Sequence, residues 1–92
     1  MKVTFINNAA ADSSFAVEWN GGESGRTVVL AANGSATIDM GNTSAPSGTS
    51  CWARAYVQGG PNHDSGQNFN VGSDDVTYRL TGGVDNVSFA MS

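Results

Sequence analysis

The chain has 92 residues, a net charge of −4 at pH 7, and only 13% charged residues. A chain of this length has room for one hydrophobic core, so we expect a single domain over residues 1–92. Its four basic residues are widely spaced and form no stripe that could follow a phosphate backbone, which argues against nucleic acid as a partner. The sequence has no apolar run long enough to span a bilayer as a helix.

Short apolar runs, nearly all closed by Gly, Asn, Ser or Asp, recur along the whole chain without helical periodicity. Each has the length of a strand, and their spacing is typical of a small sandwich or barrel. In chain order they read KVTFIN, SFAVEW, TVVLA, SATIDM, CWARAYV, NFNV, VTYRL and VSFAM. The pattern predicts an all-β fold, a single-domain antiparallel β-sandwich of about seven to eight short strands.

Alternation within the runs predicts which side chains face the core, because successive side chains of a strand point to opposite faces. Residues 2–7 alternate weakly, so both faces of that strand are expected to be covered. The other predicted inward residues are Phe15, Val17, Trp19, Ala36, Ile38, Met40, Phe69, Val71, Val76, Tyr78, Leu80, Val87, Phe89 and Met91.

The pair Asn33-Gly34 stands between the runs at residues 27–31 and 35–40. Asn-Gly between two strand-like segments is a strong signal for a tight hairpin turn, because both residues tolerate positive φ. The sequence therefore predicts a β-hairpin formed by these two runs.

Residues 51–57 differ from the other runs because their two faces are unlike. One face is small and apolar, and the other, formed by Trp52, Arg54 and Tyr56, places two aromatic rings around a guanidinium. Sugars bind such surfaces by stacking their C–H faces on the rings and bonding their hydroxyls to polar side chains. If the aromatic side chains instead belong to the core, Arg54 lies at its rim, and the sequence leaves both arrangements open.

Polar side chains close to this strand in the sequence extend the candidate site. The loop after residue 57 offers amide, imidazole and carboxylate groups, and loops at one end of a sandwich often bind ligands. The segment Trp19-Asn20-Gly21-Gly22-Glu23 is a second candidate, because a Trp at the end of a strand followed by amide and carboxylate groups can line a pocket or extend the first site. The alternative is that Trp19 closes the end of the core. The full predicted ligand-binding set is Trp52, Arg54, Tyr56, Asn62, His63, Asp64, Asn68, Trp19 and Asn20.

Catalytic and metal-binding chemistry finds little support in the sequence. His63 is the single histidine, and the adjacent Asp64 would point to the opposite face of an extended segment, so no catalytic relay is indicated. The scarcity of His and Cys also argues against a zinc site. We therefore expect no enzyme activity, no catalytic residue, no metal and no cofactor. The single cysteine, Cys51, is expected to be a buried, unreactive thiol, with a bond between two chains as the alternative.

The weakly charged, amide-rich composition suits neutral ligands. In composition the chain resembles the small soluble lectins that fungi and some bacteria make without a signal peptide, and this resemblance implies a non-catalytic, carbohydrate-binding domain. The expected partners are glycans or glycoconjugates, bound by a homodimer or larger homo-oligomer because single sites for sugars are weak. Met1 and Lys2 lead directly into a strand without a signal-peptide pattern, which predicts a cytoplasmic protein or one released by a non-standard route.

Two alternatives remain open. The first is a membrane-associating or toxin-like β-sandwich whose exposed Trp and Tyr side chains lie at a lipid interface. With so few cations, its target would be a neutral lipid. The second is a structural, self-assembling module without a small ligand, joined through its edge strands.

Overall fold

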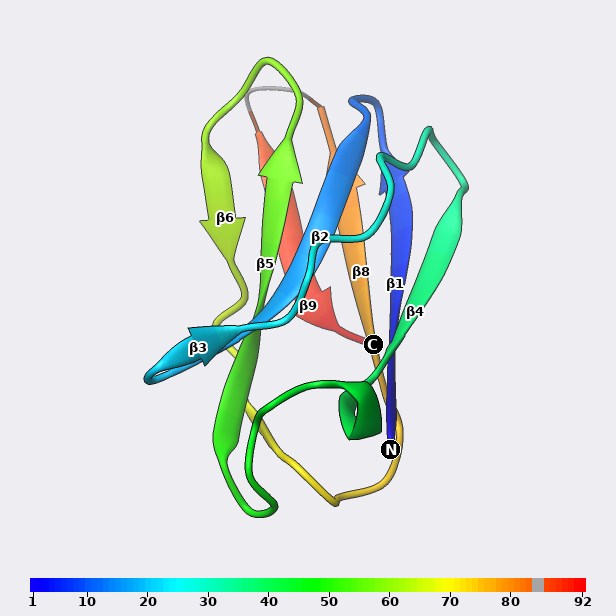
Figure 1. Cartoon of the computed structure of the whole chain (residues 1–92). Coiled ribbons are helices and arrows are strands. Elements are labelled where there is room, and N and C mark those ends of the chain that lie inside the picture. Colours follow the sequence, from blue (N-terminus) through cyan, green and yellow to red (C-terminus); the bar gives the residue numbers. More distant parts are fainter. Residues whose placement is uncertain (84–85) are drawn as a thin grey trace.

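The computed structural model describes residues 1–83 and 86–92 and shows two β-sheets packed face to face (Figure 1). Within these ranges the chain forms nine short strands and one 3₁₀ turn. The four-stranded sheet has the order β4-β1-β8-β9, and the five-stranded sheet has the order β3-β2-β5-β6, with β7 also paired to β5. The elements are β1 (Lys2–Ala9), β2 (Ser13–Trp19), β3 (Gly22–Glu23), β4 (Ser35–Asp39), η1 (Met40–Asn42), β5 (Ser50–Val57), β6 (Asn62–Asp64), β7 (Phe69–Asn70), β8 (Val76–Gly82) and β9 (Val87–Met91).

The prediction of an all-β sandwich is confirmed, with two corrections of detail. The described residues form nine strands rather than seven to eight: the predicted run at residues 27–31 is not a strand, and the very short β3 and β6 are too polar to appear as apolar runs. The sandwich is also not wholly antiparallel, since β1 pairs with β8 in parallel, from Val3 opposite Val76 to Ala9 opposite Gly82. Side-chain alternation reports which faces of a strand are covered, and it carries no information on the direction of the neighbouring strand.

The core lies between the sheets and centres on aromatic rings from both of them. Phe15 of β2 stacks on Phe5 of β1, with ring centres 5.1 Å apart and planes within 12°. Phe15 also contacts Phe89 of β9 at 5.5 Å, and Tyr78 of β8 lies 6.2 Å from Phe5. The Tyr78 hydroxyl donates to the Gln67 carbonyl at 2.9 Å, and burial raises the pKa of Tyr78 to about 12. Every side chain predicted to face inward belongs to this core or packs against it.

The predicted hairpin between residues 27–31 and 35–40 is wrong, although its turn exists. Asn33 adopts the left-handed conformation (φ 69°), and the Gly34 amide donates to the Ala31 carbonyl at 2.9 Å. The segment before the turn follows the edge of β2 in the five-stranded sheet, whereas β4 after the turn pairs with β1 in the four-stranded sheet. The Asn-Gly turn therefore carries the chain from one sheet to the other, which a local turn signal cannot distinguish from a hairpin.

Residues 24–30 run along β2 at an unusual spacing. The amides of Ser24, Thr27 and Leu30 donate to the carbonyls of Val17, Phe15 and Ser13 at 2.9, 2.8 and 2.8 Å. The donor residues of this segment are thus three residues apart, whereas the acceptor residues of β2 are two residues apart. A segment at this spacing cannot return a carbonyl to each strand amide, so a regular ladder does not form.

Side-chain hydroxyls supply the missing acceptors. The Ser24 Oγ accepts from the Val17 amide at 2.8 Å, and the Thr27 Oγ1 accepts from the Phe15 amide at 3.1 Å. The same arrangement recurs in this sheet on the edge of β5 that faces away from β2. There the Ser65 amide donates to the Ala53 carbonyl (2.8 Å) and the Ser65 Oγ accepts from the Ala53 amide (3.2 Å). We call each such pairing of one Ser or Thr with one strand residue a hydroxyl clasp. These clasps satisfy buried backbone groups that would otherwise have no partner.

Candidate functional site

The outer face of the five-stranded sheet carries the Trp52, Arg54 and Tyr56 side chains. The alternating residues of β5, among them Cys51, Ala53 and Ala55, are fully buried in the core. This settles which face of the strand is buried: the small side chains allow β5 to approach the aromatic rings between the sheets. Cys51 is accordingly a buried thiol, and burial raises its pKa.

Long side chains lie flat over this outer face and cover it. In the β2–β5 register, Ala16 is opposite Arg54 and Ser14 is opposite Tyr56, and both small β2 residues are buried although they point away from the core. Trp52 and Arg54 are half-buried, and Tyr56 is only 8% exposed. On this outer face, long side chains of β5 therefore cover the small side chains of β2, and we call them and their contacts the outer layer.

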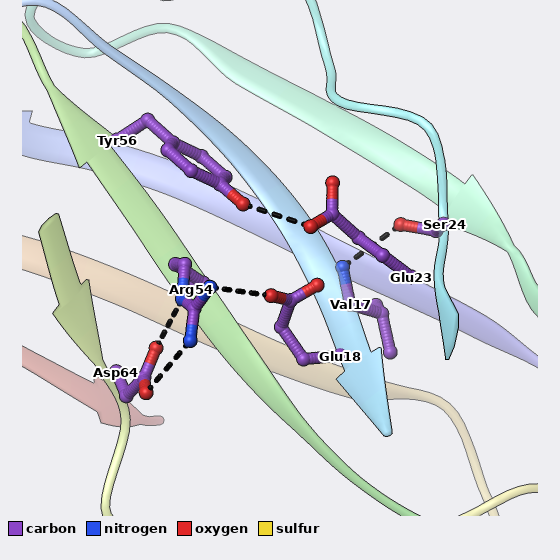
Figure 2. Close-up of polar contacts among 7 residues, drawn as sticks. All are labelled: Val17, Glu18, Glu23, Ser24, Arg54, Tyr56 and Asp64. Atoms are coloured by element: carbon purple, nitrogen blue, oxygen red, sulfur yellow. Dashed lines mark hydrogen bonds and ion pairs between the residues drawn. The ribbon is translucent and has the colours of Figure 1, made fainter. Parts of the chain in front are cut away.

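Arg54 joins three strands of the sheet through two carboxylates (Figure 2). Its Nε and Nη2 donate to the two carboxylate oxygens of Asp64 on β6 at 2.6 and 3.2 Å, and its Nη1 lies 2.7 Å from Oε1 of Glu18 on β2. The fork with Asp64, the strongest contribution, raises the pKa of Arg54 above its usual value. All three guanidinium nitrogens thus have carboxylate partners within the protein, and these contacts use three of the five N–H donors of Arg54.

Tyr56 is held from two sides. Its hydroxyl donates to Oε2 of Glu23 on β3 at 2.9 Å, and the guanidinium carbon of Arg26 lies 3.6 Å from its ring centre. Burial, followed by the hydrogen bond with Glu23, raises the pKa of Tyr56. Because Arg26 covers the ring in a cation–π contact, a sugar cannot stack on Tyr56 without displacing it.

Glu18 is the buried acid of this layer. Its side chain is 8% exposed, and its Oε2 has no hydrogen-bond partner among the described residues. Burial, and next the neighbouring Glu23, raise the pKa of Glu18 to about 7, while Arg54 acts in the opposite direction. Glu18 is therefore able to titrate near neutral pH.

The remaining predicted site residues divide between this face and other places. Asp64 is opposite Arg54 and Asn62 is opposite Tyr56, so both belong to the outer face. Asn68 reaches its far end, where its Nδ2 donates to Ser50 Oγ at 3.1 Å. Three residues lie elsewhere: His63 is opposite the core residue Ala55, Asn20 is exposed in the β2–β3 turn, and Trp19 is buried in the core, where its indole covers Gly22.

The predicted ligand-binding set left out three residues of this layer: Glu18, Glu23 and Arg26, of which Glu23 lies in the second candidate segment. A signal for the two acids was present, because each lies one residue beyond the pair that closes the tight turn Asn20-Gly21, and such a turn places these residues opposite one another. The position of Arg26 over Tyr56 has no comparable signal, since it depends on how residues 24–30 follow β2.

The arrangement is a flat surface rather than a cleft. Over residues 1–83 and 86–92, the structure has no ligand-sized pocket and no group of three or more His, Cys, Asp or Glu side chains that could hold a metal ion. The same residues include no helix that is long and apolar enough to cross a bilayer. Such a surface can bind through exposed rings and apolar side chains, or through its network of charges.

Comparisons with known proteins relate this chain to others by its fold. No family model matches the sequence, and no curated protein matches it. Two structures of pneumolysin match with TM-scores of 0.55 and 0.54, at 13% and 12% identity, covering 99% of this chain and 23% and 22% of theirs. Listeriolysin O matches with a TM-score of 0.54 at 9% identity, covering 99% of this chain and 22% of its own. The chain thus shares its fold with a segment of each cytolysin and spans less than a quarter of their length.

Proposed function

We propose that this chain is a membrane-associating β-sandwich module without enzymatic activity. The observation that carries the proposal is the fold likeness to pneumolysin and listeriolysin O, which extends over 99% of the chain. The names of both proteins describe lysins, agents that act on membranes. The net charge of −4 favours a neutral lipid surface over an anionic one.

Two exposed valines offer an apolar contact for such a surface. Val28 is 75% exposed and Val29 is 53% exposed, and they are the large hydrophobic side chains that stand out in the described part of the chain. They lie on the segment that follows the edge of β2, directly after the Thr27 clasp. Transfer of two valine side chains from water supplies about 2–4 kcal/mol, which gives only weak binding for one copy. Stable association would therefore require several copies acting together.

Replacing both Val28 and Val29 by serine is expected to reduce the fraction bound to vesicles at least about tenfold, because the apolar transfer energy is lost. The measurement is co-sedimentation with neutral phosphatidylcholine vesicles, prepared with and without cholesterol. The matched control replaces Ala31 and Ala32, which are exposed in the same region, by serine and is expected to bind like the wild type. Failure of the wild-type protein to sediment with either vesicle at tens of micromolar would contradict the proposal.

A second candidate, carbohydrate binding, is favoured by the position of Trp52. With Tyr56 covered by Arg26, Trp52 is the ring of the outer face that remains half-exposed, and the Asn68–Ser50 hydrogen bond places an amide and a hydroxyl at the same end of β5. A stacking ring beside such groups suits a sugar. Selective binding on a glycan array that is lost in Trp52→Ala and retained in Tyr56→Phe would support this function, and the absence of any bound glycan would exclude it.

A further inference from the structure

We infer that Glu18 and Glu23 share one proton and that this proton fastens β3 to β2, so that the attachment of the β3 edge responds to pH. The two residues are directly opposite in the β2–β3 register. Like charges at such a position repel, so two ionised carboxylates would push the strands apart. A proton held between them turns the same contact into a hydrogen bond. The inference goes beyond the proposed membrane association and does not depend on it.

The charges around Glu18 leave room for that proton. The groups that face it are Glu23 from β3, Arg54 and Tyr56 from β5, and Asp64 from β6, with Arg26 over the Tyr56 ring. Among the described residues Arg54 is bound to two of these carboxylates, Glu18 and Asp64, whereas Glu23 accepts from the Tyr56 hydroxyl. It gives two of its donors to Asp64 and one to Oε1 of Glu18. Arg54 therefore gives Glu18 a single ionic contact, and Glu18 is the one carboxylate of the three that is buried, where a charge is costly.

The unpaired oxygen of Glu18 shows where the proton belongs. Oε2 is buried and has no donor among the described residues, and a buried oxygen of this kind is costly when it carries charge. Protonation makes Oε2 a donor, and the carboxylate of Glu23 on the opposite strand is the acceptor. The Tyr56 hydroxyl donates to Oε2 of Glu23 and holds that carboxylate in place. Figure 2 shows Glu23 and Glu18 on neighbouring strands with their carboxyl groups on the same face of the sheet.

The direction of the pH effect follows from the pKa of Glu18, which burial and Glu23 raise from 4.5 to about 7. A carboxyl group whose pKa is higher in the folded state than in the unfolded state binds its proton more tightly when folded. The resulting stabilisation is complete below pH 4.5, decreases as the pH rises, and is lost once the pH has passed about 7. The β3 edge is therefore fastened in mild acid and loosened above neutral pH.

β3 is the element that responds because it is very short and one of its two pairs with β2 is the carboxyl pair itself. It has two residues, and its pairs with β2 are Glu18 opposite Glu23 and Trp19 opposite Gly22. The Gly22 pair is a close packing of backbone on the Trp19 ring, since a Cβ at Gly22 would lie 2.7 Å from the indole nitrogen. The Ser24 clasp follows immediately along the chain. Loss of the carboxyl contact is therefore transmitted first to the Ser24 clasp.

The test is a carbon-13 NMR titration of the glutamate carboxyl groups in the wild type and in Glu23→Gln. We expect Glu18 to titrate with a midpoint near 7 in the wild type. In Glu23→Gln the midpoint should fall by about one pH unit or more, because the amide removes a negative charge and offers a donor to Glu18. A wild-type midpoint below about 5.5, or one that Glu23→Gln leaves unchanged, would overturn the inference.

Amide hydrogen exchange separates a local effect from a change in global stability. The protection factor of the Ser24 amide is expected to fall about tenfold or more between pH 5.5 and pH 8 in the wild type, and to change much less in Glu18→Gln. The internal control is the Ser65 amide, which belongs to the clasp on Ala53 of β5 in the same sheet. Its protection factor should not change with pH in the same way. Parallel loss of protection at Ser24 and Ser65 would show that the whole domain responds and would contradict a local fastening of β3.

Discussion

Replacing Asn7 by leucine is expected to lower the free energy of unfolding by about 3–5 kcal/mol. Asn7 is fully buried near the end of β1. Its Nδ2 donates to the carbonyls of Ala11 and Leu30 at 2.9 and 2.8 Å, and its Oδ1 accepts from the Ala9 amide at 3.0 Å. Leucine has a similar volume and shape, so the substitution removes these bonds without leaving a large cavity.

The expected loss is large because the partners of Asn7 are backbone groups that cannot turn toward water. The Leu30 carbonyl retains the Ser13 amide as a donor at 3.0 Å, so the main penalty falls on Ala11 and Ala9. Each buried polar group left unpaired costs about 1–3 kcal/mol. The side chain also ties β1 of one sheet to the segment that bridges to β2 of the other at Leu30. Its removal therefore weakens the connection between the sheets.

Thermal and urea unfolding measure this effect directly. In a domain of this size, 1 kcal/mol shifts Tm by about 4–8 °C, so a decrease of more than about 12 °C is expected. Asn8→Leu is the control. Asn8 is only half-buried and bonds to Asn33 and Arg79 through side chains alone, and its replacement should cost less than about 1 kcal/mol. Equal losses for the two substitutions would show that the buried bonds of Asn7 do not stabilise the fold.

The double substitution Ser24→Ala with Thr27→Val is expected to cost about 2–4 kcal/mol. Each hydroxyl accepts the amide of a buried residue of β2, Val17 and Phe15. Without the hydroxyls these two amides have no acceptor, because the spacing of residues 24–30 brings no carbonyl to them. Valine is close in shape to threonine, so the loss at position 27 reports the hydrogen bond rather than the packing.

Chemical unfolding of the double variant is compared with that of Thr4→Val. The Thr4 Oγ1 lies 3.1 Å from the Thr37 Oγ1 across β1 and β4, on an exposed part of the other sheet, and its loss should cost less than about 0.5 kcal/mol. If the double variant and Thr4→Val are equally stable, the hydroxyl clasps are not what satisfies the edge of β2. Increased self-association of the double variant would be a further sign that this edge has been freed.

The candidate site was accessible to sequence reasoning only in part. The sequence predicted that Trp52, Arg54 and Tyr56 share one face, and the structure places them on the outside of the five-stranded sheet. It did not predict that Arg54 is occupied by Glu18 and Asp64. Glu18 and Arg54 lie far apart in the sequence, and only the pairing of β2 with β5 brings them together. Arg54 and Tyr56, which look available for a ligand in the sequence, are therefore already engaged with other side chains of the protein.

The sequence by itself determined where most of the strands lie and which of their side chains point inward, because alternation with a period of two is a local property of the backbone. It likewise located the turn at Asn33, since the tolerance of Asn and Gly for positive φ is also local. Only the tertiary structure decided that this turn joins two sheets, that β1 and β8 are parallel, and that Glu18 meets Glu23. Those contacts join separate segments, and their free energy comes from burial and hydrogen bonding that no single segment contains.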